Sequence, residues 1–224
     1  MKRAVAKQLE FRHPAGWGGK RDNAGRKRAK GRGRVGHSTR PAHKAAHPVH
    51  ATLRALATVG SLRDFPVLLA LEAALAAASS DAFRIVHYSI QHDHLHLILE
   101  AHDREARIRG LQGLAIRCAR VINRALERKG KVWADRYHAR ELRTPREVRN
   151  ALVYVLHNWK KSVRGAESLD PCATGYWFDG WKGPRPLWSL TAHPSPVRAA
   201  RTWLLTTGWR RHGLIGFDER PASD

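Results

Sequence analysis

The sequence has little cysteine, few acidic residues and no long hydrophobic run. Its two cysteines, Cys118 and Cys172, are too few for a disulfide framework or a cysteine-based zinc module. The longest apolar stretch, residues 65–78, is interrupted by Glu72 and is too short to span a bilayer. No apolar signal core follows the basic residues near Met1. These absences predict a cytoplasmic protein with no membrane partner.

The scarcity of acidic residues gives the chain a large positive charge. Lys and Arg number 41 against 19 Asp and Glu, so the formal net charge is +22. Such a charge attracts polyanions, because each phosphate that a basic side chain neutralises releases counterions. The basic residues do not gather on one amphipathic surface helix, so nucleic acid is a better partner than an anionic membrane.

Composition divides the chain into three regions. Residues 1–47 hold fourteen Lys and Arg, two acidic residues and many glycines, which predicts a flexible basic arm that orders on DNA. Regular hydrophobic patterns cover residues 48–165 and predict the folded domain. Residues 166–224 are rich in Trp, Pro and Gly without a clear period, and we expect an irregular C-terminal extension.

The patterns within the folded domain predict the order β-α-β-β-α-β-α. Ser61 and Asp64 suggest a capping box for the first helix, Asp103 can cap the second, and the run from Thr144 to Glu147 suggests a capping box for the third. This order predicts an α+β protein with a ferredoxin-like antiparallel sheet and its helices on one face. The expected strands are residues 49–54, 83–91, 94–100 and 138–143, and the expected helices are residues 65–79, 103–129 and 145–163.

Two histidines on the third predicted strand could bind a metal ion. His94 and His96 are two residues apart, so they point to the same side of a strand. Two adjacent imidazoles can chelate a divalent ion, although a His-x-His pair alone is weak support for a metal site. His92 lies close by, where it either joins the site or occupies the turn.

A tyrosine and an asparagine on the last helix complete a possible site. Tyr154 and Asn158 are four residues apart and therefore share a helix face. A tyrosine in an apolar stretch is most often a core residue, and an asparagine one turn later is usually a boundary residue. Combined with the histidine pair, they describe two imidazole ligands, an amide oxygen and a phenol.

Three sequence blocks together resemble a known group of enzymes. Residues 92–99 (HDHLHLIL) resemble the His-hydrophobe-His motif of the HUH endonucleases. Residues 132–140 and 151–158 are similar to the single-tyrosine transposases, in particular the REP-associated tyrosine transposases. The resemblance covers about residues 48–165. It implies a ferredoxin-like fold, a Mg²⁺ or Mn²⁺ ion, single-stranded and often hairpin-bearing DNA as substrate, and a place at the bacterial nucleoid.

The resemblance also implies a role for individual residues. Tyr154 would be the nucleophile of a metal-dependent nicking and strand-transfer reaction that passes through a 5′-phosphotyrosine. His94 and His96 would be metal ligands and Asn158 the third ligand, although Trp159 follows it where the family usually has proline. Both monomers and homodimers fit the family. We expect DNA contacts from Arg117, Arg120, Arg124, Arg136, Arg140, Lys160 and Lys161.

Several alternatives remain open from the sequence. Tyr137, beside Arg136, is a competing nucleophile, whereas Tyr88 is expected in the core. The arginines of residues 103–129 fit a solvated face as well as a DNA-binding face. The C-terminal tryptophans could stack on bases, but packing against the domain is the better interpretation. A non-catalytic hairpin-binding protein and a zinc-stabilised module are the alternative functions.

Overall fold

The computed structural model describes residues 42–161, 169–183 and 195–221. Most of the predicted basic arm therefore lies outside the described residues, as does Trp188. No helix within the described ranges is both long enough and apolar enough to cross a membrane.

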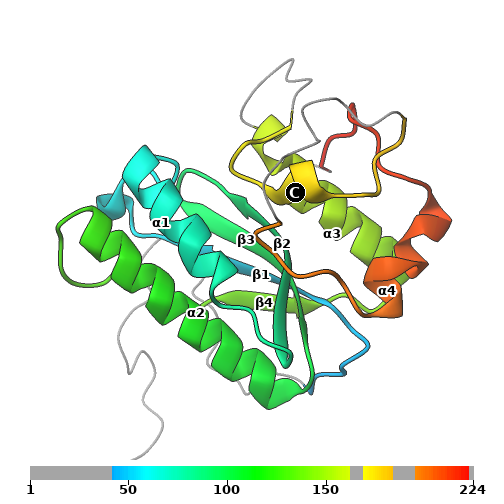
Figure 1. The fold of residues 1–224 in the computed structure, drawn as a ribbon, viewed down its shortest axis with the longest axis horizontal. Coiled ribbons are helices and arrows are strands. Elements are labelled where there is room, and N and C mark those ends of the chain that lie inside the picture. Colours follow the sequence, from blue (N-terminus) through cyan, green and yellow to red (C-terminus); the bar gives the residue numbers. More distant parts are fainter. Residues whose placement is uncertain (1–41, 162–168, 184–194, 222–224) are drawn as a thin grey trace, which may run out of the picture. The chain divides into compact units, whose positions relative to one another are not determined.

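The centre of the fold is a four-stranded antiparallel sheet (Figure 1). The strands lie in the order β2-β3-β1-β4, and a register shift between Ile85 and His87 interrupts the pairing of β2 with β3. This order places the hairpin of β2 and β3 beside β1 and confirms the ferredoxin-like arrangement. The strands are β1 (Val49–Arg54), β2 (Phe83–Ile90), β3 (His94–Ala101) and β4 (His138–Glu141).

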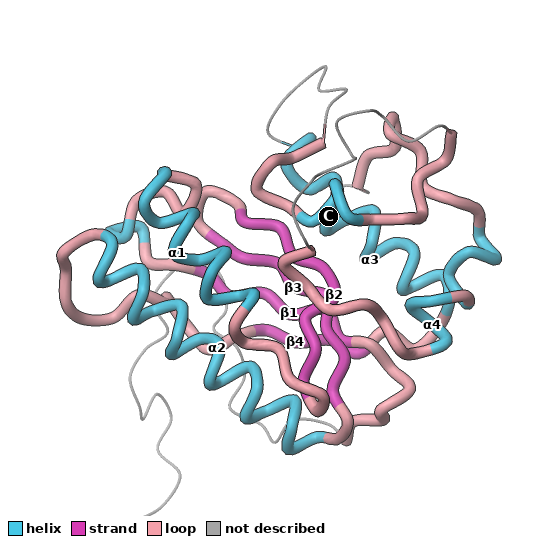
Figure 2. The backbone as a smooth tube through the Cα atoms, viewed as in Figure 1, coloured by secondary structure: helices cyan, strands magenta, loops and turns pink. Residues whose placement is uncertain are grey.

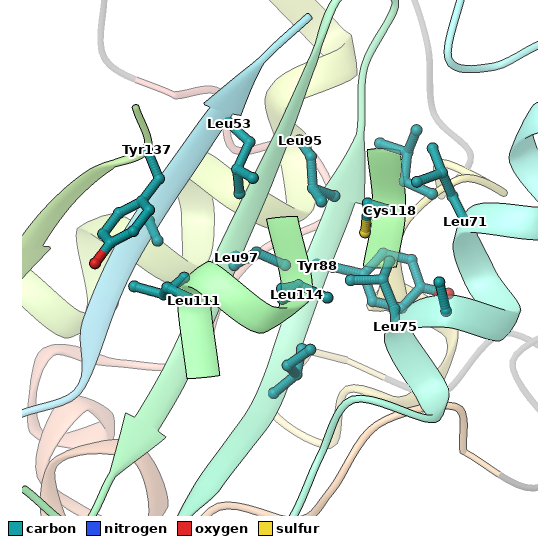
Figure 3. Packing of buried hydrophobic residues seen from close by; sticks show 14 of the residues in the cluster. Leu53, Leu71, Leu75, Tyr88, Leu95, Leu97, Leu111, Leu114, Cys118 and Tyr137 are labelled. Atoms are coloured by element: carbon teal, nitrogen blue, oxygen red, sulfur yellow. The ribbon is translucent and has the colours of Figure 1, made fainter. Parts of the chain in front are cut away.

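Helices α1 (Phe65–Ala76) and α2 (Arg104–Ala125) run side by side over the first face of the sheet (Figure 2). Alternate residues of the strands and the apolar stripe of α2 form the core between them. Asp103 caps α2 by accepting a hydrogen bond from the Ala106 amide at 2.7 Å, as expected. The helix α1 differs, since Asp64 rather than Ser61 holds its N-cap position. Figure 3 shows Leu53, Leu95, Leu97, Leu111, Leu114 and Cys118 in this core.

The second face of the sheet packs against α3 (Pro145–His157). The prediction that the helices lie on one face is therefore correct for α1 and α2 and wrong for α3. The reason is that Val86 and Ile98 place apolar side chains on this second face, where they pack with α3. Thr144 and Glu147 form the predicted capping box. The helix ends at His157, earlier than predicted, and continues as a short 3-10 helix, η2 (Asn158–Lys161).

The described parts of the C-terminal extension, residues 169–183 and 195–221, form short helices and turns that share a hydrophobic core with α3. It also covers the edge of β2, because Ile90 donates to the Cys172 carbonyl at 2.8 Å and Arg198 donates to the Ile85 carbonyl at 2.9 Å. Trp181 and Trp209 are buried, whereas Trp203 is exposed. The short helices are η1 (Ala57–Val59), η3 (Thr174–Trp177), α4 (Trp203–Thr206) and η5 (Gly208–His212).

Candidate active site

The predicted histidine pair lies on the second face of the sheet, the face that α3 covers. His94 and His96 follow each other on this side of β3, and their ring centroids are 4.6 Å apart. Leu95 and Leu97 alternate with them and enter the first core. His96 is buried and His94 is partly exposed. One imidazole is thus held inside the protein, and the other stands where solvent or a substrate can reach it.

A third histidine, His50 of β1, completes a cluster. In the register of β1 with β3, Thr52 lies opposite His96 and His50 lies opposite Ile98. The His50 and His96 ring centroids are 5.3 Å apart. His96 Nδ1 lies 3.3 Å from His50 Nε2 and 3.1 Å from Thr52 Oγ1. His50 is not among the site residues predicted from the sequence, although the alternation of β1 could have placed it on the polar side of the strand.

Tyr154 of α3 reaches the same cluster. Its ring centroid is 5.0 Å from that of His96 and 5.6 Å from that of His50. The Nζ atom of Lys161, in η2, lies 4.5 Å from the centre of the Tyr154 ring, within the range of a cation–π interaction. Tyr154 is partly buried rather than enclosed in the core. The structure therefore brings together the tyrosine and both histidines that the sequence placed far apart.

The competing tyrosines are remote from this cluster. Tyr88 and Tyr137 are both buried in the first core (Figure 3). Leu97 belongs to this core and alternates with His96 on β3, so His96 lies on the opposite side of the sheet. Tyr88 is in the core as predicted, and burial beside Glu72 raises the pKa of its phenol. Tyr137 therefore does not share a site with the histidines.

Acidic and basic neighbours hold the outer histidine in one orientation. His94 Nδ1 lies 2.6 Å from Asp93 Oδ1, and Arg54 forms an ion pair with the other oxygen of this carboxylate. The pKa of Asp93 is lowered, because the hydrogen bond from His94 and the charges of His94 and Arg54 outweigh its partial burial. An ionised Asp93 accepts the Nδ1 proton of His94 and leaves the lone pair of Nε2 for a ligand.

Burial keeps the inner histidines neutral. The pKa of His96 lies well below its usual value, because burial and then the positive charges of His50, His94 and Lys161 disfavour the imidazolium. Burial, followed by Arg140 and His138, lowers the pKa of His50 to about 4. A neutral imidazole is the form that binds a metal ion.

Two of the residues predicted as metal ligands have a buried side-chain nitrogen without a hydrogen-bond partner among the described residues. Among the described residues, no hydrogen-bond partner is found for His96 Nε2 or for the side-chain nitrogen of Asn158. The oxygen and nitrogen of an amide exchange places when the side chain is turned. The described ranges contain no group of three or more His, Cys, Asp or Glu residues arranged to hold a metal ion. The ligand set expected from the sequence, two imidazoles from His94 and His96 and the amide of Asn158, is not of that kind and stays a prediction.

The basic residues expected to bind DNA are spread over both faces of the domain. Arg140 of β4 lies opposite His50 in the sheet register, so it belongs to the site face, and it is exposed. Lys161 reaches Tyr154. Lys160 is buried and donates to the Phe217 carbonyl, so the expectation that it contacts DNA is wrong. Arg136 is exposed in the loop before β4, and Arg117, Arg120 and Arg124 are exposed on α2, over the opposite face of the sheet.

Comparison with known proteins finds a transposase family that is similar to part of the chain. Residues 69–158 match the family model described as "Transposase IS200 like", and this segment contains both histidines of β3, Tyr154 and Asn158. The match confirms the resemblance found in the sequence. No curated protein matches the chain.

A solved structure shows the same fold. It is that of a REP-associated tyrosine transposase bound to a REP hairpin. The two chains superpose with a TM-score of 0.50 and 16% sequence identity, and the match covers 62% of this chain and 82% of the other. Residues 69–158 are thus similar to IS200-like transposases, and the fold around them is similar to that of the solved transposase.

Proposed function

We propose that this protein cuts and rejoins single-stranded DNA through a covalent bond between Tyr154 and a 5′ phosphate. The observation that carries the proposal is the placement of the Tyr154 ring 5.0 Å from that of His96. The segment containing both residues matches a transposase family. The solved relative binds a REP hairpin, which supports hairpin-bearing DNA as the substrate of this chain as well.

The proposed reaction exchanges one phosphate ester for another. The Tyr154 oxygen attacks the scissile phosphorus, the bond to the 3′ oxygen breaks, and the leaving strand takes up a proton as a 3′ hydroxyl. The phosphotyrosine keeps the ester bond, so the 3′ hydroxyl of another strand can displace Tyr154 without ATP. This reversal joins the two strands and returns the free phenol.

The remaining residues have separate tasks in this proposal. His94, His96 and Asn158 would hold a divalent ion such as Mg²⁺ or Mn²⁺, which offsets phosphate charge when bound. Asp93 and Thr52 fix the two imidazoles by hydrogen bonds to their Nδ1 atoms. Oxygen and imidazole ligands together suit Mn²⁺ better than Mg²⁺, which prefers oxygen alone.

A covalent-adduct assay tests the proposal. The protein is incubated with a labelled library of single-stranded hairpin oligonucleotides and Mn²⁺ or Mg²⁺, and the products are separated on a denaturing gel. We expect an adduct that EDTA prevents and that Tyr154→Phe abolishes, whereas Tyr137→Phe retains it. Hairpin binding without an adduct across the library would instead identify a non-catalytic binding protein.

A further inference from the structure

The last described stretch of the chain, residues 213–221, is hydrogen-bonded to α3, the helix that carries the proposed nucleophile. We name residues 213–221 the tail segment. Arg149 of α3 makes four hydrogen bonds to it. Arg149 Nε donates to the Gly213 carbonyl at 2.9 Å and Nη2 donates to the Leu214 carbonyl at 3.0 Å. The guanidinium also binds both carboxylate oxygens of Glu219, at 3.0 and 2.7 Å. A two-point bond of this kind fixes orientation as well as distance.

The tail segment is also fastened at the far end of α3. His157 Nε2 lies 3.1 Å from the Gly216 carbonyl oxygen, and its imidazole is buried. The Lys160 ammonium donates to the Phe217 carbonyl. In the opposite direction, Arg220 Nη1 donates to the Lys160 carbonyl at 3.2 Å. The turn that follows α3 is thus held through a side chain and through its backbone.

The tail segment is anchored by buried and stacked side chains. Ile215 is fully buried and pairs with Trp181 in a parallel bridge. The ring of Phe217 stacks on that of Trp181 with centroids 4.9 Å apart. Glu219 accepts a hydrogen bond from the Gly216 amide at 2.8 Å, which closes the segment on itself. A segment anchored in this way can restrain the helix to which it is bonded.

The restrained turn, η2, carries two groups of the proposed site. Asn158 opens η2, and Lys161 closes it with its ammonium over the Tyr154 ring. Both lie next to residues that the tail segment holds. We propose that the tail segment is a positioning device that fixes η2, so that Asn158 and Lys161 keep their places beside Tyr154, with Arg149 and Glu219 as its positioning residues.

The expected effect on the reaction rests on the proposed function, whereas the restraint of η2 by the tail segment does not depend on it. None of residues 213–221 lies within the 69–158 match to the transposase family. The restraint is therefore supplied by a part of the chain outside that family segment. Because reacting groups must be held close to their productive geometry, a small displacement of η2 should slow the chemical step more than it weakens DNA binding.

The test compares two arginines with similar bonds in different places. Arg149→Ala removes the bonds to the tail segment, and Arg149→Lys keeps the charge without the two-point bond. Arg63→Ala is the matched control, because Arg63 binds both oxygens of Asp170, at 3.0 and 2.6 Å, and donates its other side-chain hydrogen bond to the Ile90 carbonyl of β2 rather than to the tail segment. Each protein is measured for hairpin affinity, for the rate of adduct formation at saturating DNA, and for amide hydrogen exchange.

We expect Arg149→Ala to lower the rate of adduct formation about tenfold or more, with hairpin affinity changed by less than about twofold. Arg149→Lys should fall between it and the wild type. Amides of residues 157–161 should exchange faster in Arg149→Ala and at the wild-type rate in Arg63→Ala. Unchanged exchange in residues 157–161, or equal loss of rate in the two alanine variants, would overturn the proposal. If the wild type forms no adduct, the proposed function fails, and hydrogen exchange alone decides whether the tail segment holds η2.

Discussion

The two faces of the sheet differ in what their strands place on them. The first face presents Leu53, Leu95 and Leu97 to α1 and α2 and forms a continuous apolar core. The second face presents His50 and His96, with Thr52 between them in the sheet, to a helix that brings a tyrosine. Strict alternation along the same strands produces both faces.

The difference agrees with the proposed function, in which the first face stabilises the fold and the second face carries the reaction. Burying an imidazole costs free energy unless its nitrogens have partners, and His96 Nε2 has none within the described part of the chain. An apolar residue at this position would pack at lower cost. The metal ion of the proposed function would give this nitrogen a partner.

Neighbouring residues of β3 give the largest expected contrast between the faces. Leu97→Ala should lower the free energy of unfolding by about 2–5 kcal/mol, because it leaves a cavity in the first core. His96→Ala should lower adduct formation by more than about a hundredfold while the protein stays folded. Urea unfolding and the adduct assay measure the two effects. If both variants lost the same free energy of unfolding, and adduct formation fell in proportion to that loss, the two faces would not differ in their roles.

Stability should depend on pH through the second face. Burial lowers the pKa of His87 to about 4, below its usual value near 6.5. Between these values the unfolded chain binds more protons than the folded one, so the free energy of unfolding falls as pH decreases from about 6.5 to about 4. His87→Gln should remove on the order of 3 kcal/mol of this dependence. Urea unfolding at several pH values measures it, and parallel curves for variant and wild type would contradict it.

The bond from Asp93 to His94 should matter for the reaction more than for the fold. Asp93→Asn keeps the size of the side chain but removes the charge that fixes the imidazole. We expect metal affinity or the rate of adduct formation to fall about 10- to 100-fold, measured by titrating Mn²⁺ in the adduct assay. Thermal unfolding of the metal-free protein serves as the control. A variant with the metal dependence of the wild type would show that Asp93 does not position His94 for a metal ion.

The smallest expected contrast concerns DNA binding by arginines on the two faces. Arg140→Ala removes an exposed charge opposite His50 and should weaken hairpin binding several-fold. The slope of the logarithm of the binding constant against the logarithm of salt concentration should fall by about one, as for the loss of one phosphate contact. The combined Arg117→Ala, Arg120→Ala and Arg124→Ala variant removes three charges from α2. Its effect should be smaller if the DNA follows the second face. A larger effect of the α2 variant in a salt titration would place the DNA over the first face instead.

The sequence predicted those features that depend on local pattern. The order of elements, the sheet class, the caps at Asp103 and Thr144, and the pairing of His94 with His96 follow from period, spacing and capping chemistry. The early end of α3 and the position of α3 on the second face were not predicted. The apolar residues of β2 and β3 permit packing on both faces, and only the fold decides which helix occupies each.

Features that depend on distant contacts could not be obtained from the sequence. His50 joins His96 only because β1 and β3 pair in one register. Lys160 resembles a DNA-binding residue in the sequence, but it is buried, and its ammonium donates a hydrogen bond to the Phe217 carbonyl, fifty-seven residues later. The C-terminal extension lacks a helical or strand period. It is nevertheless bonded to α3 by single side chains of that helix, such as Arg149, which donates to the Gly213 carbonyl.

The most direct test of this account is the formation of a covalent DNA adduct by the wild type, Tyr154→Phe and Tyr137→Phe on one hairpin substrate with Mn²⁺. The account predicts adducts with the wild type and Tyr137→Phe and none with Tyr154→Phe, and peptide mapping should locate the DNA on Tyr154. An adduct that survives in Tyr154→Phe, or that maps to Tyr137, would contradict the assignment of the active site to the second face of the sheet.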